Sequence, residues 1–302
     1  MRIGFFGLPL AALCLLADGH DLQWGVLSPI SAPGLRRLRI ALGARPLLLA
    51  AERSESALVA DIDALVRSHP PDLIVSWYWT RRIQTEWLDS TRLGGVGVHP
   101  SLLPRHRGPN PFFWTIDRGD ELAGASVHWL DANYDTGRVI AQRSLPVGHM
   151  NSWQLARALD RVSLAALRDA VGALSRGEAL DGVAQDEAKA TWAPEPADDA
   201  LILHPSWDVE RAARRIRALS PVPGLSLCVR GLDLFVTAVV TAPGPEPLAP
   251  GEAAVWPGTE RVALAVQDGV LLIERAVDAE TGLEFDGAAL AAEVARRAPD
   301  AD

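Results

Sequence analysis

His99 and Asp135 are the residues of this 302-residue chain whose types and surroundings best suit proton chemistry. His99 follows a short apolar run at residues 96–98 and precedes Pro100, so it stands where a strand ends. Asp135 stands two residues before Gly137, between two strand-like runs. An imidazole and a carboxylate on neighbouring loops of one sheet edge can pass a proton between them. The pattern predicts acid–base chemistry, with two purely structural residues as the alternative.

The segment after His99 is a stiff, basic loop, PSLLPRHRGPNP, at residues 100–111. Its four prolines restrict the backbone, and Arg105, His106 and Arg107 are consecutive within it. A loop that is ordered in advance loses little entropy when it holds an anionic or polar ligand. We therefore expect this loop to bind such a ligand beside the histidine.

We expect His99 and Asp135 to meet because a sheet places the ends of their strands side by side. The sequence of the first two-thirds of the chain predicts such a sheet. Strand-like and helix-like runs alternate there, which favours a doubly wound α/β domain with a mainly parallel sheet. Such sheets keep their ligand crevice at the carboxyl ends of the strands. The strand-like runs are 2–6, 21–28 and 72–79, and the helix-like runs are 9–20, 54–71 and 152–176.

The chain changes character near residue 193. Residues 193–206 are rich in proline and acids and lack a sustained period, which predicts a linker. Beyond it a helix-like run precedes several short extended runs, two of which flank Asp268-Gly269, a strong hairpin signal. We predict a doubly wound domain over 1–192 and a smaller C-terminal antiparallel β-barrel-like (OB-like) domain over 207–302.

Composition excludes several classes of protein. The net charge of −9 disfavours non-specific attraction to nucleic acid or anionic lipid. Cys14 and Cys228 are too few for a disulfide framework or a thiolate zinc site, and no zinc or phosphate-loop spacing occurs, so we expect no metal. No apolar run is long enough to span a membrane. Gly4, Gly7 and Pro9 break the apolar N-terminus, which favours a strand–turn–helix over a signal peptide and a cytoplasmic location.

Other residues carry weaker signals. Arg81 and Arg82 follow an apolar run, and they could meet an acidic group of a substrate or simply face solvent. The basic run at residues 36–39 is expected to form a surface helix. His128 falls on a strand-like run, so we expect a packed or hydrogen-bonded role for it rather than a catalytic one.

Several segments resemble the folate-dependent formyltransferases. VHPSLLPRHRGPNP at 98–111, followed by DANYDTG at 131–137, resembles the histidine loop and the Asp-x-Gly of that family. MRIGFFGLPLAALCLL is similar to the family's N-terminal strand–turn–helix, and DLIVSWYWTRRI resembles the pterin-side segment of members that act on nucleotide-linked amino sugars. RALSPVPG and DGVLLIERAV resemble the C-terminal domain of methionyl-tRNA formyltransferase.

The resemblance implies a reaction in which a formyl group passes from 10-formyltetrahydrofolate to an amine. By position, His99 would donate to the oxyanion that forms and relay a proton, and Asp135 would orient His99. The residues implied to bind the folate are Tyr78, Trp79, Leu102, Leu103 and Arg105. Those implied to lie near the substrate or the oxyanion are Gly97, Arg107 and Asn110.

Gly97 departs from the pattern, because the family has Asn-x-His where this chain has Gly97-Val98-His99. The missing asparagine would offer its amide to the formyl oxygen, and losing one such donor typically costs about 10²–10³ in rate. Three explanations stay open at this point. Asn110 or a water could fill the space, the acceptor itself could supply the contact, or the protein could be a catalytically impaired relative that only binds folate.

The charge of the C-terminal segment bears on the acceptor. Residues 207–302 carry nine arginines and no lysine against fifteen acids, a net charge of −6. A domain that binds tRNA needs arginine or lysine side chains that face the phosphates. The composition therefore favours a small-molecule amine, such as an amino sugar or a modified amino acid, over tRNA as the partner. Methionyl-tRNA formyltransferase is the alternative activity.

Overall fold

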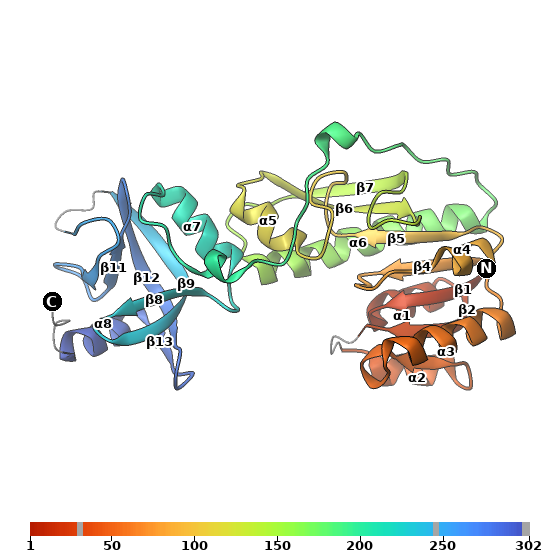
Figure 1. Ribbon diagram of the computed structural model, residues 1–302, viewed down its shortest axis with the longest axis horizontal. Helices are drawn as coiled ribbons and strands as arrows, with labels where there is room; N and C mark the ends of the chain where they lie inside the picture. The colour runs from red at the N-terminus through yellow and green to blue at the C-terminus, as the bar shows by residue number, and fades with distance from the viewer. Residues whose placement is uncertain (29–32, 244–247, 298–302) are drawn as a thin grey trace. The chain divides into compact units, whose positions relative to one another are not determined.

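The computed structural model describes residues 1–28, 33–243 and 248–297 and forms two compact units (Figure 1). The first unit comprises Met1–Pro111, Leu122–Leu145 and Ala158–Ala193. The second comprises Phe112–Glu121, Pro146–Arg157 and Pro194–Asp302. The chain thus contributes two short segments to the second unit before it reaches residue 193. The domain boundaries expected from the sequence stay a prediction.

The first unit is built on a seven-stranded sheet with the order β3-β2-β1-β4-β5-β6-β7. The first five strands of that order pair in parallel, and β6 pairs antiparallel to β5. The chain order reverses between β1 and β4, and doubly wound sheets bind their ligands beyond the carboxyl ends of the strands at such a point. The predicted doubly wound, mainly parallel fold is confirmed. The strands are β1 Arg2–Gly7, β2 Asp21–Leu27, β3 Leu47–Leu49, β4 Leu73–Trp77, β5 Gly95–His99, β6 Leu122–Trp129 and β7 Val139–Pro146.

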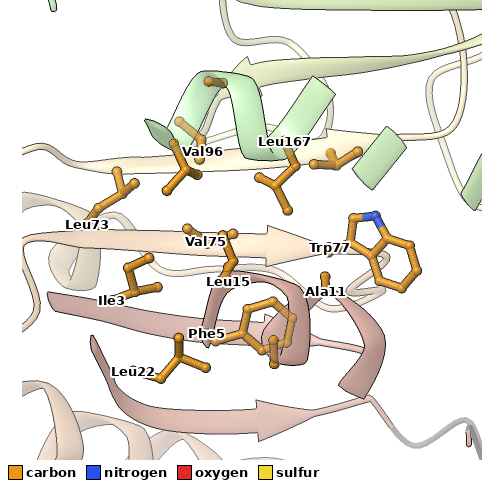
Figure 2. Packing of buried hydrophobic residues seen from close by; sticks show 14 of the residues in the cluster. Ile3, Phe5, Ala11, Leu15, Leu22, Leu73, Val75, Trp77, Val96 and Leu167 are labelled. Carbon is orange, nitrogen blue, oxygen red and sulfur yellow. The ribbon is translucent and has the colours of Figure 1, made fainter. Parts of the chain in front are cut away.

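Helices cover both faces of this sheet. On one face the side chains of β1, β4 and β5 share a buried cluster with α1 and α6, and Figure 2 shows Ile3, Val75 and Val96 in it together with Leu15 and Leu167. On the other face α3 and α4 pack against the alternate residues of the strands. Burial on both faces explains why β4 is apolar almost throughout. The helices are α1 Pro9–Ala17, α2 Leu35–Leu42, α3 Glu55–Ser68, α4 Thr85–Asp89 and α6 Ser152–Ser175.

Local signals account for where several helices begin and end. Ser54 caps α3 by accepting a hydrogen bond from the Ala57 N–H, and α1 begins at a proline. Helix α6 ends at Ser175, two residues before Gly177, whose φ of +83° is the left-handed conformation that favours glycine. The basic run at 36–39 lies in α2, as expected. Strand β3 and helix α4 are too short to show a period, so the sequence did not predict them.

The second unit is a curled antiparallel sheet with helices packed on it. The strand order is β10-β11-β12-β9-β8, and β13 pairs with β12. Asp268 lies in the turn between β11 and β12 and Gly269 begins β12, so the predicted hairpin is present, and Arg230-Gly231 closes a second hairpin with φ of +49° and +65°. The predicted smaller antiparallel domain is confirmed. The elements are β8 Leu225–Val229, β9 Leu232–Pro243, β10 Ala253–Val255, β11 Val262–Ala265, β12 Gly269–Asp278, β13 Glu284–Asp286, α5 Pro111–Asp117, α7 Val209–Ala218 and α8 Gly287–Arg296.

A buried ion pair joins α5 to α7 inside the second unit. Arg215 Nε and Nη2 donate to the two carboxylate oxygens of Asp117 at 2.6 and 3.1 Å, and both side chains are less than a tenth exposed. The guanidinium lies over the rings of Phe113 and Trp207, with its carbon 5.3 and 4.7 Å from the ring centroids. Nη1 donates to the Ala200 carbonyl oxygen at 2.9 Å. The charge is buried, paired and hydrogen-bonded, as a stable interior charge must be.

Removing one partner of this pair is expected to destabilise the second unit strongly. Asp117→Ala leaves the Arg215 charge buried without a counter-ion, so we expect the free energy of unfolding to fall by about 3–5 kcal/mol. Chemical denaturation followed by tryptophan fluorescence measures the change. Asp169→Ala is the control, because its pair with Arg143 is exposed and should contribute under about 1 kcal/mol. An equal loss of unfolding free energy in the two variants would contradict a stabilising role for the buried Asp117–Arg215 pair.

Candidate active site

The candidate site lies at the carboxyl ends of the central strands. Strand β5 ends at His99, and Tyr78 directly follows the end of neighbouring β4. The loop that begins at Pro100 and the loop that holds Asp135 follow β5 and β6. The parallel strands β4 and β5 bring Tyr78 and His99 to one edge, where doubly wound sheets bind their ligands. Strand β6 runs antiparallel to β5, so the Asp135 loop leaves from the opposite end of the sheet, and the loop itself brings the carboxylate to His99.

His99 and Asp135 face each other. His99 Nδ1 lies 3.4 Å from Asp135 Oδ1, and the two side chains are 8% and 18% exposed. His99 Nε2 lies 2.7 Å from the His106 carbonyl oxygen, and since a carbonyl only accepts, Nε2 carries a proton. Asp135 Oδ2 accepts a hydrogen bond from the Gly108 N–H at 3.0 Å. The structure thus brings the predicted pair together, with the Nδ1 side of the ring facing the carboxylate.

His128 is a third member of this group that the sequence analysis assigned only a packing role. Its Nδ1 lies 2.9 Å from the Trp129 carbonyl oxygen, to which it must donate, and its Nε2 lies 3.7 Å from Asp135 Oδ1. Burial lowers the pKa of His128, while the nearby Asp135 carboxylate opposes that shift. Two imidazoles therefore present a ring nitrogen to one carboxylate oxygen. That arrangement is favourable when a proton lies between them.

Gly97 lies directly opposite His128 in the antiparallel pairing of β5 with β6. A Cβ atom at position 97 would lie 2.7 Å from Leu130 Cδ2 and 3.0 Å from His128 Nε2. The side chains of Leu130 and His128 therefore occupy the space beside the glycine, where Asn110 was one of the expected occupants. The register of the two strands was the missing signal, since a glycine opposite a histidine makes room for the ring.

Arg107 is held by protein groups. Its guanidinium donates to Gln185 Oε1 at 2.8 and 3.1 Å and to the two Glu187 carboxylate oxygens at 2.9 and 2.8 Å, and the residue is buried. The Glu187 carboxylate raises the pKa of Arg107. These contacts anchor the loop after His99, and they favour a structural role for Arg107 over the expected contact with substrate. The backbone of Asn110 is also held in place, because its backbone N–H donates to the Ala193 carbonyl oxygen.

The remaining loop residues expected to bind folate are also placed by hydrogen bonds. The Leu103 N–H donates to Ser126 Oγ at 3.0 Å, and its side chain is buried, whereas Leu102 is half-buried. The Arg105 carbonyl oxygen accepts from Ser101 Oγ at 2.6 Å. The loop is thus built around internal contacts, in agreement with the stiffness expected of it. The folate-binding roles of these residues stay predictions.

Tyr78 and Trp79 differ in how their polar atoms are satisfied. Tyr78 stacks on Trp77 at 4.2 Å between ring centroids, and its hydroxyl donates to Ser163 Oγ at 3.2 Å. Burial raises the pKa of Tyr78 well above its usual range. Trp79 Nε1 is buried without an acceptor among the described residues. An indole N–H left in this state beside the predicted crevice fits a ligand with ring oxygen or nitrogen acceptors, such as a pterin.

Residues 1–28, 33–243 and 248–297 contain no cluster of three or more histidine, cysteine or acidic side chains with the arrangement of a metal site. No helix within these ranges is long and apolar enough to cross a membrane.

Solved structures share this fold. HypX from Aquifex aeolicus in complex with tetrahydrofolic acid superposes with a TM-score of 0.67 at 20% identity, over 99% of this chain and 49% of that one. The chain therefore spans about half the length of HypX. Glycinamide ribonucleotide transformylase 1 from Symbiobacterium toebii superposes with a TM-score of 0.53 at 23% identity, over 62% of this chain and 94% of that one. At these identities the likeness concerns the fold alone.

Sequence comparison gives the relationship directly. The family model described as formyl transferase matches residues 36–169. Methionyl-tRNA formyltransferase of Bordetella pertussis is 35% identical over 254 residues, covering 77% of this chain and 80% of that protein. Methionyl-tRNA formyltransferase of Anaeromyxobacter dehalogenans is 32% identical over 293 residues, covering 91% of each. With the sheet edge and the histidine loop that the structure shows, this chain belongs to the folate-dependent formyltransferase family.

Proposed function

We propose that this protein moves a formyl group from 10-formyltetrahydrofolate to the amino group of methionyl-tRNA. The observation that carries the chemistry is the approach of His99 Nδ1 to Asp135 Oδ1 at the end of β5. The acceptor is supported by the two relatives named methionyl-tRNA formyltransferase, which match 77% and 91% of the chain. They favour the alternative activity over the small-molecule acceptor that composition favoured.

The reaction needs a group that takes a proton and later returns one. A bond forms between the amine nitrogen and the formyl carbon, the bond from that carbon to the folate nitrogen breaks, a proton leaves the amine and a proton reaches the departing nitrogen. Both ring nitrogens of His99 are engaged, Nε2 by a backbone carbonyl and Nδ1 by Asp135. We take the Nδ1 side of the ring, which faces Asp135 Oδ1 at 3.4 Å, as the side through which a proton passes, and the His106 carbonyl oxygen keeps the ring in this orientation.

A short arginine run on α7 supports the tRNA acceptor. Arg211 is exposed and lies over the ring of Trp207, with 4.6 Å from its guanidinium carbon to the ring centroid. Arg214 and Arg217 are half-buried on the same helix. Arg215 points the other way into its buried pair and is not available to a phosphate. Three cations on one helix can contact a nucleic-acid backbone even though the segment as a whole is acidic.

The second candidate is formylation of a small-molecule amine, such as an amino sugar or a modified amino acid. Its specific support is the net charge of −6 over residues 207–302, which opposes the approach of tRNA phosphates. A third candidate follows from Gly97. Without the family's asparagine the protein could hold folate and transfer nothing, which makes it an impaired relative rather than an enzyme.

Removing either member of the His99–Asp135 pair is expected to abolish most of the activity. His99→Asn and Asp135→Asn each remove one side of the shared proton, so kcat/KM should fall about 10²–10⁴-fold. Single-turnover assays with 10-formyltetrahydrofolate and methionyl-tRNA measure the effect. His149→Asn, at an exposed loop histidine, is the control. Activity of either site variant within threefold of the unaltered protein would refute the role.

The acceptor is tested by binding and transfer together. We expect methionyl-tRNA to bind, and Arg211→Ala with Arg214→Ala to weaken binding and lower the salt dependence by about one unit for each lost phosphate contact. Arg296→Ala on α8 is the control, because that arginine is exposed and paired with Glu293. Transfer to small amines without tRNA binding would establish the second candidate. Folate binding without transfer to any amine would establish the impaired relative.

We expect that only glycine fits at position 97, because Leu130 and His128 leave no room for a side chain. Gly97→Asn puts a Cβ into the space of Leu130 and His128, so we expect the free energy of unfolding to fall by about 1–3 kcal/mol, with a parallel loss of activity. Gly97→Asn combined with His128→Ala should recover part of the stability, because the ring that meets the new side chain is gone. Denaturation of the four members of this cycle measures the coupling. A zero coupling energy would show that the two positions do not compete for space.

A further inference from the structure

A segment far along the chain binds both loops of the candidate site. Residues 181–193, here called the strap, follow α6 and precede the second unit's C-terminal segment. At its start Val183 exchanges two backbone hydrogen bonds of 2.8 Å with Val139, just after the Asp135 loop. At its end Thr191 and Ala193 bond to the backbone of Arg107 at 2.9 and 2.7 Å. The strap therefore contacts the Asp135 loop at one end and the His99 loop at the other.

Gln185 is the strap residue whose side chain bonds to both loops. Its Nε2 donates to the carbonyl oxygens of Asp135 and Gly137, at 2.8 Å each. Its Oε1 accepts from Arg107 Nε and Nη2 at 3.1 and 2.8 Å. Two donations and two acceptances use the full capacity of the amide group. One side chain thus joins the loop that carries Asp135 to the loop that follows His99.

The surroundings also fix which way the amide points. If its oxygen and nitrogen were exchanged, the oxygen would face two carbonyl oxygens and the NH₂ group would face two guanidinium N–H groups. All four contacts would then be repulsive. Only a group with an acceptor on one side and a donor on the other satisfies this position, so a carboxylate of the same shape does not.

The contacts made by Gln185 bear on the distance between His99 and Asp135. Asp135 has the left-handed φ of +58°, and Gln185 holds its backbone carbonyl from one side while the Gly108 N–H holds its carboxylate from the other. Gly108 directly follows Arg107, the residue that Gln185 binds on the other loop. The amide therefore closes a ring of contacts that includes the carboxylate and the loop of the catalytic histidine.

We propose that Gln185 is a positioning residue that sets the separation of His99 and Asp135 by bonding to both of their loops. The consequence for catalysis rests on the proposed function, whereas the consequence for the pair's geometry does not. A misplacement of about 1 Å in a reacting group can cost about 10²-fold in rate. Gln185 touches neither substrate nor the reacting atoms, and it acts through the two loops.

The test compares Gln185→Glu with Gln185→Met. The glutamate keeps the shape and the bonds to Arg107 but turns an oxygen toward two carbonyl oxygens, and the methionine removes all four bonds while keeping the length. Glu187→Gln is the matched control, because Glu187 binds the same guanidinium but its side chain is 70% exposed and makes no contact with the Asp135 loop among the described residues. Thermal denaturation of each variant establishes which proteins are folded.

Two readouts distinguish positioning from a merely structural role. The first is transfer, where kcat should fall about 10²-fold in both Gln185 variants with the KM for folate little changed, and the pH profile should approach that of Asp135→Asn. The second is the titration of the His99 ring, followed by NMR in the protein without ligands. In Gln185→Met, which adds no charge, its midpoint should move in the same direction as in Asp135→Asn, whereas Gln185→Glu adds a carboxylate that by itself opposes this change. His128 and Arg107 are the other charged or titratable groups that interact with Asp135, Asp131 acts on both of them, and all three are kept in the variants.

The outcomes separate this proposal from the proposed function. A moved His99 titration in a protein that formylates nothing would support the positioning role and defeat the proposed function. An unmoved His99 titration in folded Gln185→Glu and Gln185→Met would overturn the positioning role, whatever happens to activity. A loss of activity in Glu187→Gln equal to that in Gln185→Met would overturn it as well, since the anchor would then be Arg107 alone.

Discussion

A single carboxylate oxygen, Asp135 Oδ1, is faced by the ring nitrogens of two histidines, at 3.4 Å from His99 and 3.7 Å from His128, and the rest of the site is built around this group. The outer nitrogens of both rings donate to backbone carbonyls, those of His106 and Trp129, so neither ring can turn away to relieve the contact. The other nitrogen of each ring therefore stays turned toward Asp135. A protein that takes a proton from an amine and returns one to a leaving nitrogen needs such a group in a place where water does not compete for it.

The backbone around this group is fixed by parts of the chain that are far apart in sequence. The glycine at position 97 admits the His128 ring across the pairing of β5 with β6. The strap ties the two loops together from residues 181–193. The proposed chemistry therefore rests on residues of the first unit, whereas the proposed tRNA acceptor rests on the arginines of α7 in the second. The two questions have separate structural answers, which is why net charge alone favoured a different acceptor from the one that the relatives support.

Much of the fold and the central pair could be predicted from the sequence, because strong local patterns encode them. Alternating runs predicted the doubly wound sheet, and the Asp268-Gly269 turn predicted a hairpin of the second unit. His99 and Asp135 could be singled out by their residue types and loop positions, although β6 runs antiparallel to β5, so the Asp135 loop and not a shared strand edge brings the carboxylate to His99. His128 and Gln185 could not be assigned, because their partners depend on strand register and on where a long irregular segment returns. Arg107 was expected to meet substrate because a basic loop residue looks the same in sequence whether its partner is a ligand or a glutamine of the protein.

The chain enters the second unit twice before residue 193, and this limits how that unit can be moved between proteins. Phe113 and Asp117 of α5 surround the Arg215 charge, and Ser152, at the start of α6, donates to the Ala218 carbonyl oxygen at the end of α7. A gene fragment beginning at the proline-rich segment would carry the arginine without its carboxylate. The C-terminal sheet therefore cannot be exchanged between proteins as one continuous segment. Recombination that replaces it must also replace Phe112–Glu121 and Pro146–Arg157, which belong to the same unit.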